Sequence, residues 1–164
     1  DNLFDAAPIL EKYGFPYTIF VSTGFVKSND KCFLNVEELR ELSSFPNARI
    51  GSHSVSHPSL VNCNDTELAN ELVSSKHFLE DVTGKDIKTF AYPFGAVNQR
   101  VRDAVENAGY LVGTTSYMNT NYHGQDQLML SRTSLLGIDS VRNFRQKIRG
   151  DWDWYRFLQD YRES

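Results

Sequence analysis

Apolar residues recur along the chain with two different periods, which predicts helices and strands in alternation. From Leu3 to Tyr13 they return every three or four residues, as in an amphipathic helix, and Gly14 is placed to end that helix. Pro8 lies in its first turns and predicts a local distortion there. Residues 17–22, YTIFVS, are β-branched and aromatic, which is typical of a buried strand.

The same two patterns continue toward the C-terminus. Asn35 with Glu38, and Asn64 with Glu67, have the spacing of a capping box, so each pair predicts the start of a helix. Asp139 is placed to cap a last helical region. The pattern predicts further strands over 48–52, 87–92, 110–116 and 128–136, and a further helix over 98–109.

Strands that alternate with helices through short loops form parallel βαβ units, so the predicted fold class is α/β. We find no internal repeat, low-complexity tract or linker, and we expect one domain over residues 1–164. Five strands that begin after a helix are too few for a closed eight-stranded barrel. Asp1 stands where a whole gene product would begin with methionine, and we therefore expect the chain to be N-terminally incomplete.

Composition narrows the range of partners. The chain is 40% hydrophobic, which supports a core of ordinary size, and its net charge of -4 gives no reason to expect nucleic acid as a partner. No apolar run reaches the roughly 20 residues that a membrane span needs. Cys32 and Cys63 are too few and too far apart to indicate a disulfide scaffold or a thiolate metal site.

Two histidines four residues apart, His53 and His57, follow the strand predicted over 48–52. In an extended strand such positions lie roughly 13 Å apart, too far for one metal ion. On a helical turn their Cβ atoms are about 6 Å apart, which permits chelation, and Pro58 disfavours continued extended pairing. The alternative is that both histidines solvate a surface turn; their place at the end of a parallel strand favours a site.

A second strand end carries the sequence FAYPFG, residues 90–95. Pro93 and Gly95 make the backbone irregular there, which can leave N–H groups unpaired and directed into a site, as an oxyanion requires. The alternative is that this proline and this glycine only terminate the strand.

Together HSVSHPSL, SSKHFLEDVTGK, TFAYPFG and VRDAVENAGY resemble the polysaccharide deacetylase family, the NodB-homology domains of carbohydrate esterase family 4. The resemblance implies a distorted (β/α) barrel, a divalent ion, most often zinc, held by two histidines and an aspartate, and a second aspartate as base. It implies that His53 and His57 are metal ligands, that the backbone N–H of Phe94 helps to hold the oxyanion, and that Tyr92 and Pro93 contact substrate.

The chain departs from the family pattern at several positions. The paired aspartates of its first motif, TFDD in many members, and the strand that carries them are expected a few residues upstream of Asp1, which is itself not assigned as a ligand. Ala91 stands where many members have arginine, which marks a subgroup. His123 is the downstream candidate for the general acid, and the alternative is a solvated loop histidine.

The resemblance implies a metal-dependent hydrolase of bacterial type that removes N-acetyl groups from the amino sugars of a polysaccharide or oligosaccharide, in the cell envelope or exported. This chain alone is expected to be inactive, because two histidines leave the site one protein ligand short. Two alternatives remain. One is a hydrolytic domain acting on a non-sugar amide, and the other is a noncatalytic member that binds glycans through aromatic residues such as Tyr92, Phe94, Tyr117 and Tyr122.

Overall fold

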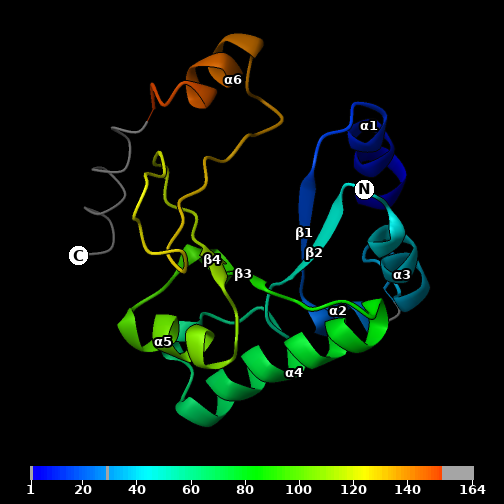
Figure 1. Ribbon diagram of the computed structural model, residues 1–164, viewed down its shortest axis with the longest axis vertical. Helices are drawn as coiled ribbons and strands as arrows, with labels where there is room; N and C mark the ends of the chain where they lie inside the picture. The colour runs from blue at the N-terminus through cyan, green and yellow to red at the C-terminus, as the bar shows by residue number, and fades with distance from the viewer. Residues whose placement is uncertain (1, 29, 153–164) are drawn as a thin grey trace.

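The fold is a parallel four-stranded sheet with helices along its outer side, seen in a computed structural model that describes residues 2–28 and 30–152 (Figure 1). The strands lie side by side in chain order, and every pair is parallel. The strands and α-helices are β1 (Tyr17–Val21), β2 (Ala48–Ser52), β3 (Thr89–Ala91), β4 (Val112–Thr114), α1 (Ala7–Lys12), α2 (Thr23–Val26), α3 (Val36–Ser44), α4 (Asp65–Thr83), α5 (Gln99–Asn107) and α6 (Val141–Ile148). A π-helical turn covers Asn2–Ala6, and 3-10 turns cover Leu60–Asn62 and Pro93–Gly95.

The predicted α/β class with a parallel sheet is confirmed, and the capping residues explain where its helices begin. Asn35 and Asn64 each accept a bond from the backbone N–H three residues later, and Glu38 and Glu67 close both capping boxes. Since these bonds are made within four consecutive residues, the sequence suffices to predict them. Helix α4 ends at Gly84, whose φ of 65° lies in the left-handed region.

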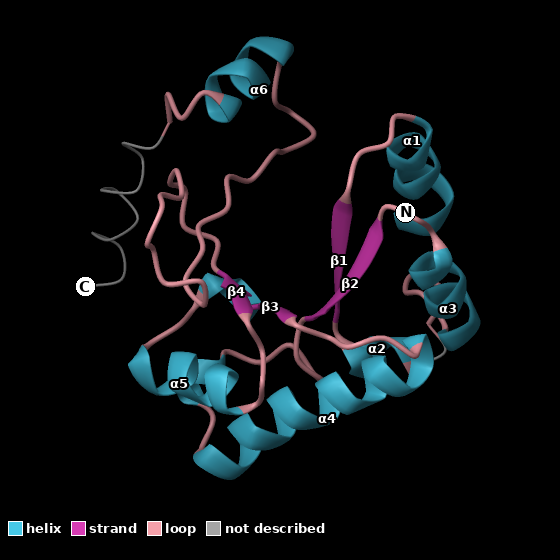
Figure 2. Ribbon diagram, viewed as in Figure 1, coloured by secondary structure: helices cyan, strands magenta, loops and turns pink. Residues whose placement is uncertain are grey.

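The order and direction of the strands determine which strand ends lie next to one another. Parallel neighbours in chain order bring the C-terminal ends of β1, β2 and β3 to one edge of the sheet. The outer side of the strands is covered by α3, α4 and α5 in turn (Figure 2). The core between these layers is apolar and includes Leu39, Leu42, Leu68, Leu72, Leu79, Phe90, Val101 and Val105.

The strand predicted over residues 128–136 is wrong. Only one residue of this segment, Leu130, bridges to the sheet, through Thr114 at the end of β4. Isolated backbone bonds continue on either side, from the N–H of Gly113 to the carbonyl of Gln127 and from the N–H of Arg132 to the carbonyl of Tyr117. Side chains add further bonds, since Asp126 accepts from the N–H of Leu128 and the Arg132 side chain donates to the carbonyl of Thr115. The connection between β4 and α6 is therefore a long loop (Figure 2).

The predicted cap of the last helix is also wrong by one residue. Ser140 caps α6 by accepting from the N–H of Asn143. Asp139 instead accepts from the N–H of Leu136 and from Nζ of Lys147, both at 2.7 Å. These two bonds hold the pKa of the Asp139 carboxyl below its usual range and give the buried ammonium group a partner.

None of the helices in the described part of the chain is both long and apolar enough to cross a membrane. The single domain expected over residues 1–164 includes a C-terminal segment, 153–164, that lies outside the described residues.

Candidate metal and active site

The two histidines lie where β2 ends, on a loop that packs against the end of β1. The N–H of His53 donates to the carbonyl of Val21 at 2.9 Å, and Oγ of Ser22 donates to the carbonyl of His53 at 2.8 Å. A third contact joins the backbones of α2 and the loop. The N–H of Gly24 donates to the carbonyl of Val55 at 2.8 Å, and a Cβ on Gly24 would lie 2.7 Å from that oxygen.

The loop from His53 to His57 is not the helical turn that was predicted. It is an irregular segment in which Ser54 has a φ of 69° and His57 a φ of 59°, both in the left-handed region. Oγ of Ser54 accepts from the N–H of His57 at 3.0 Å. Two left-handed residues therefore bring the rings together, in a conformation that non-glycine residues adopt at a cost of about 1–3 kcal/mol each.

The imidazole rings of His53 and His57 face each other through their Nε2 atoms, which are 3.1 Å apart. Nδ1 of His53 lies 2.7 Å from the carbonyl oxygen of Ala91, at the end of β3. A carbonyl oxygen only accepts, so Nδ1 carries the proton and Nε2 of His53 offers a lone pair.

This geometry fits a tetrahedral metal ion. Two Zn–N bonds of about 2.0–2.1 Å at a tetrahedral angle place the nitrogens about 3.3–3.4 Å apart, close to the separation seen here. A ligating histidine also commonly donates its other ring N–H to a carbonyl, as His53 does. Within residues 2–28 and 30–152, however, no third histidine, cysteine, aspartate or glutamate joins them in a metal-binding cluster.

Burial is the main reason that the pKa of His53 lies below its usual value. The bond to Ala91 opposes this shift, while electrostatic interactions with His57 and Arg132 add to it. A lowered pKa keeps the imidazole of His53 neutral, as a metal ligand must be.

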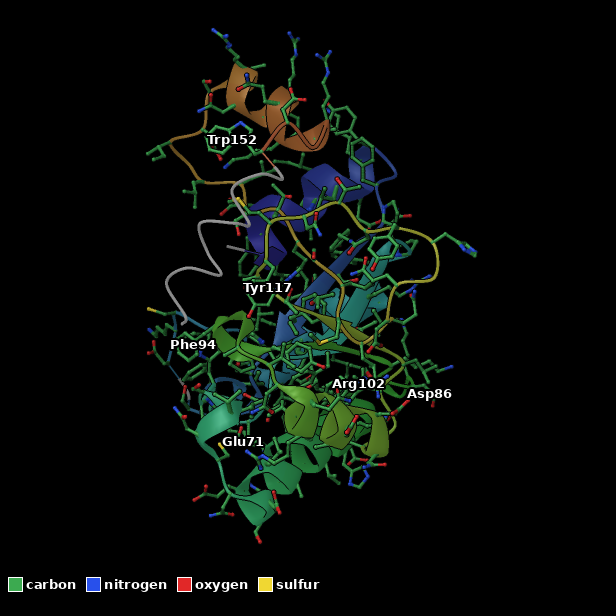
Figure 3. The ribbon with its side chains drawn as sticks, turned by 90° about the vertical axis from the view of Figure 1, so that its left-hand side faces the viewer. Glu71, Asp86, Phe94, Arg102, Tyr117 and Trp152 are labelled. Atoms are coloured by element: carbon green, nitrogen blue, oxygen red, sulfur yellow. The ribbon has the colours of Figure 1, made fainter. Side chains whose placement is uncertain are left out.

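Phe94 lies beside the histidines, at the end of β3. Its ring contacts that of His57 edge-on, with centroids 4.7 Å apart, and the residue is 69% exposed. Phe94 is labelled in Figure 3. Phe94 has a φ of 60°, and no acceptor in the described part of the chain pairs with its backbone N–H. This N–H is therefore free to donate to a ligand.

The residues before Phe94 do not fit the expected contact with substrate. Tyr92 is fully buried, and its hydroxyl donates to the carbonyl of Leu128 at 2.9 Å. Pro93 is buried as well. The expectation that these two side chains bind substrate is corrected accordingly, because both are buried, and Tyr92 instead holds the loop through its bond to Leu128.

His123 lies in an exposed turn of the loop that follows β4. None of the hydrogen bonds or ring contacts at the two histidines involves His123. The structure thus brings together His53, His57 and Phe94, but it does not place His123 among them.

Two charged residues at this site were not predicted from the sequence. Glu71, on α4, accepts three hydrogen bonds from Val55 and Ser56, between the two histidines. Arg132, in the loop after β4, lies over the ring of Phe20 at 5.5 Å and donates through Nε to the carbonyl of Thr115 at 2.8 Å.

Replacing Arg132 with glutamine is expected to raise the pKa of His53, because the variant removes a positive charge that disfavours the imidazolium. His53 has a lower pKa when folded than when unfolded, so the unfolded chain binds more protons and stability falls as pH drops below about 6.5. The free energy of unfolding of the variant should therefore decrease less than that of the unmodified chain as pH drops. NMR titration of the metal-free chain measures the shift, with Arg142→Gln, an exposed site, as control. An unchanged pKa of His53 would contradict the expectation.

A cavity of about 470 Å³ opens beside the histidines. Its wall includes His53, His57, residues 19–22 at the end of β1, and residues 31–34 of the following loop. Within the described sheet, β1 pairs only with β2, so its other edge carries no partner there, and residues 19–21 of this strand line the cavity.

Known proteins resemble this chain in both sequence and structure. The family model "Polysaccharide deacetylase" matches residues 1–113. YxkH of Bacillus subtilis (strain 168), assigned by name to the polysaccharide deacetylases, is 28% identical over 132 residues, which cover 80% of this chain and 46% of YxkH. The structure of the Streptococcus pyogenes deacetylase PplD, in complex with acetate, superposes with a TM-score of 0.83 at 25% identity, covering 90% of this chain and 65% of that one.

Two further solved structures share the fold. BC0361, a polysaccharide deacetylase from Bacillus cereus, has a TM-score of 0.78 at 24% identity and is matched over 90% of this chain and 48% of its own. BA3943 of Bacillus anthracis, a pseudoenzyme of carbohydrate esterase family 4, has a TM-score of 0.61 at 20% identity, over 70% of this chain and 38% of its own. The chain thus spans less than two thirds of the length of these relatives. Since the family model covers more than half of its 164 residues, the chain belongs to the polysaccharide deacetylase family.

Proposed function

We propose that this chain forms part of a metal-dependent N-deacetylase that removes acetyl groups from the amino sugars of a polysaccharide. The observation that carries the proposal is the pair of Nε2 atoms, of His53 and His57, 3.1 Å apart at the C-terminal edge of a parallel sheet. Family membership supports the acetyl group as the target, and the PplD structure was obtained with acetate, the product of such a reaction.

In this proposal His53 and His57 hold a divalent ion, and we assign it as zinc because imidazole ligands suit that metal. Such an ion, when bound, lowers the pKa of a water toward about 7 and polarises a carbonyl group. The backbone N–H of Phe94 donates a hydrogen bond to the acetyl oxygen as negative charge develops on it. The bond from His53 to the carbonyl of Ala91 keeps the imidazole oriented and in the ligating tautomer.

The carboxylates that complete the site come, in our proposal, from a strand that precedes Asp1. The unpaired edge of β1 offers hydrogen-bonding groups for such a strand, and the cavity beside it reaches both histidines. An aspartate at the C-terminal end of that strand would lie at the same edge of the sheet as His53. This arrangement also gives a reason why the described residues contain only two ligands.

A second candidate function is a noncatalytic glycan-binding protein of the same fold. The absence of a carboxylate ligand within the described residues favours it, as does the structural similarity to a pseudoenzyme, BA3943. The exposed side chains of Phe94 and Tyr122 would then supply apolar contacts, whereas Tyr92 is buried and cannot.

The full-length protein, loaded with zinc, is expected to release acetate from N-acetylated chitooligosaccharides. A chelator should abolish this release and added zinc should restore it, because the ion supplies the nucleophile and polarises the carbonyl. Simple acetamides, assayed in parallel, distinguish a sugar deacetylase from a general amidase. A folded, zinc-loaded protein that binds the oligosaccharide without releasing acetate would refute the enzymatic proposal and support the glycan-binding one.

A further inference from the structure

A buried carboxylate, that of Glu71, lies directly behind the loop that carries the two histidines. Glu71 lies in the first half of α4, and only 8% of its surface is exposed. Figure 3 shows it on the same side of the molecule as Phe94, which contacts His57. Burial of a charged group is costly unless that group is well bonded, so its contacts indicate what it does.

Within the described residues, this carboxylate accepts three hydrogen bonds, and all of them come from residues between the histidines. Oε2 accepts from the backbone N–H groups of Val55 at 2.7 Å and Ser56 at 2.9 Å, and Oε1 accepts from Oγ of Ser56 at 2.7 Å. No lysine or arginine in the described part of the chain forms an ion pair with Glu71. Its negative charge is therefore satisfied by the loop itself.

These bonds act at the strained part of the loop. Ser54 and His57 both have positive φ, and Val55 and Ser56 lie between them. Two backbone N–H groups in such a loop have no partner from regular secondary structure, and an ionised acceptor binds them more strongly than a neutral one. Without that acceptor, the loop loses the contacts that offset its strain.

Helix α4 holds the beginning of the same loop as well. Oγ of Ser75, one helical turn after Glu71, lies 2.8 Å from Oγ of Ser52, the last residue of β2. The helix therefore fixes the loop at two points, one before His53 and one between the histidines.

We infer that Glu71 is a positioning residue that holds Val55 and Ser56 in place and so sets the distance between the imidazoles of His53 and His57. Both of its oxygens face the loop, so it is not itself a ligand. The consequence for metal affinity rests on the proposed function, whereas the effect on the loop does not.

The test replaces Glu71 with glutamine in the full-length protein. The amide keeps the size of the side chain but carries no charge and only one acceptor oxygen, so its hydrogen bonds with Val55 and Ser56 are weaker than those of the carboxylate. Zinc affinity, measured by competition with a chelator, should fall by about 10- to 100-fold, as when other residues that support metal ligands are lost. Asp81→Asn, a carboxylate-to-amide change at an exposed site of the same helix, should leave zinc affinity unchanged.

A second readout requires no metal. Hydrogen exchange of the amides of Val55 and Ser56 should become faster in Glu71→Gln relative to the core amides, and the NMR cross-peak between the two imidazoles should weaken. Ser56→Ala removes one of the three bonds and should have a smaller effect in the same direction, which keeps the inference testable if Glu71→Gln does not fold.

The outcomes separate the two proposals. If the unmodified protein binds no zinc, the proposed function fails, while the exchange rates still decide the role of Glu71. If it binds zinc and Glu71→Gln retains both its affinity and the protection of Val55 and Ser56, the inference is overturned. Equal losses of protection across the whole chain would likewise overturn it, since they would indicate a general effect on stability.

Discussion

Replacing His53 with alanine is expected to abolish zinc binding by the full-length protein and, with it, acetate release. The variant removes one of two converging imidazoles and also the bond to the carbonyl of Ala91. Loss of a residue that only supports a ligand costs about 10- to 100-fold in affinity, so loss of the ligand itself should exceed about 100-fold. Calorimetry or chelator competition measures the affinity, and an acetate assay measures the turnover.

The matched control is His77→Ala. His77 lies on α4 with its side chain exposed, so its loss changes the histidine count but not the site. We expect zinc affinity to be unchanged in this variant. Zinc binding that is lost equally in both variants, or in neither, would refute the assignment of His53 as a ligand.

The second large effect is expected from Gly95→Ala, in the loop that presents Phe94. Gly95 has a φ of 75°, and a Cβ there would lie 2.6 Å from the backbone nitrogen of Ser116. Strain at positive φ and overpacking against the backbone add to each other, and together they should destabilise the fold by about 2–4 kcal/mol. Chemical denaturation measures this change.

Gly137→Ala provides the control for this variant. Gly137 has no positive φ, and a Cβ there would meet no atom of the described residues within 4 Å. The free energy of unfolding of Gly137→Ala should stay within about 0.5 kcal/mol of that of the unmodified chain, as for substitutions at other open surface sites. A Gly95→Ala variant with the same stability as Gly137→Ala would show that the loop after β3 relaxes without cost.

The sequence predicted those features that depend on neighbouring residues. Both capping boxes are confirmed because the side chain and the backbone group that it bonds are three residues apart. The α/β class is confirmed for a similar reason, since each strand and helix has its own apolar pattern. The segment 128–136 has a strand-like pattern too, but only Leu130 bridges to the sheet, and the side chains of Asp126 and Arg132 make hydrogen bonds on either side of it.

The candidate site was predictable only in part. The spacing of His53 and His57 indicated convergence, but not that two left-handed residues produce it. Glu71 was missed because the residues that it bonds lie 15 and 16 residues away. One signal was present, since Glu71 falls on the face of α4 that also buries Leu68 and Ser75, where a carboxylate needs a partner.

Because Gly24 contacts Val55, the geometry of the site also depends on a residue that has no side chain. Any larger residue at position 24 would push on the carbonyl of Val55, and through it on the segment that joins the two histidines. A saturation mutagenesis screen for zinc retention should therefore recover position 24 among its most intolerant sites. In such a screen a glycine that touches no cation would score like a ligand.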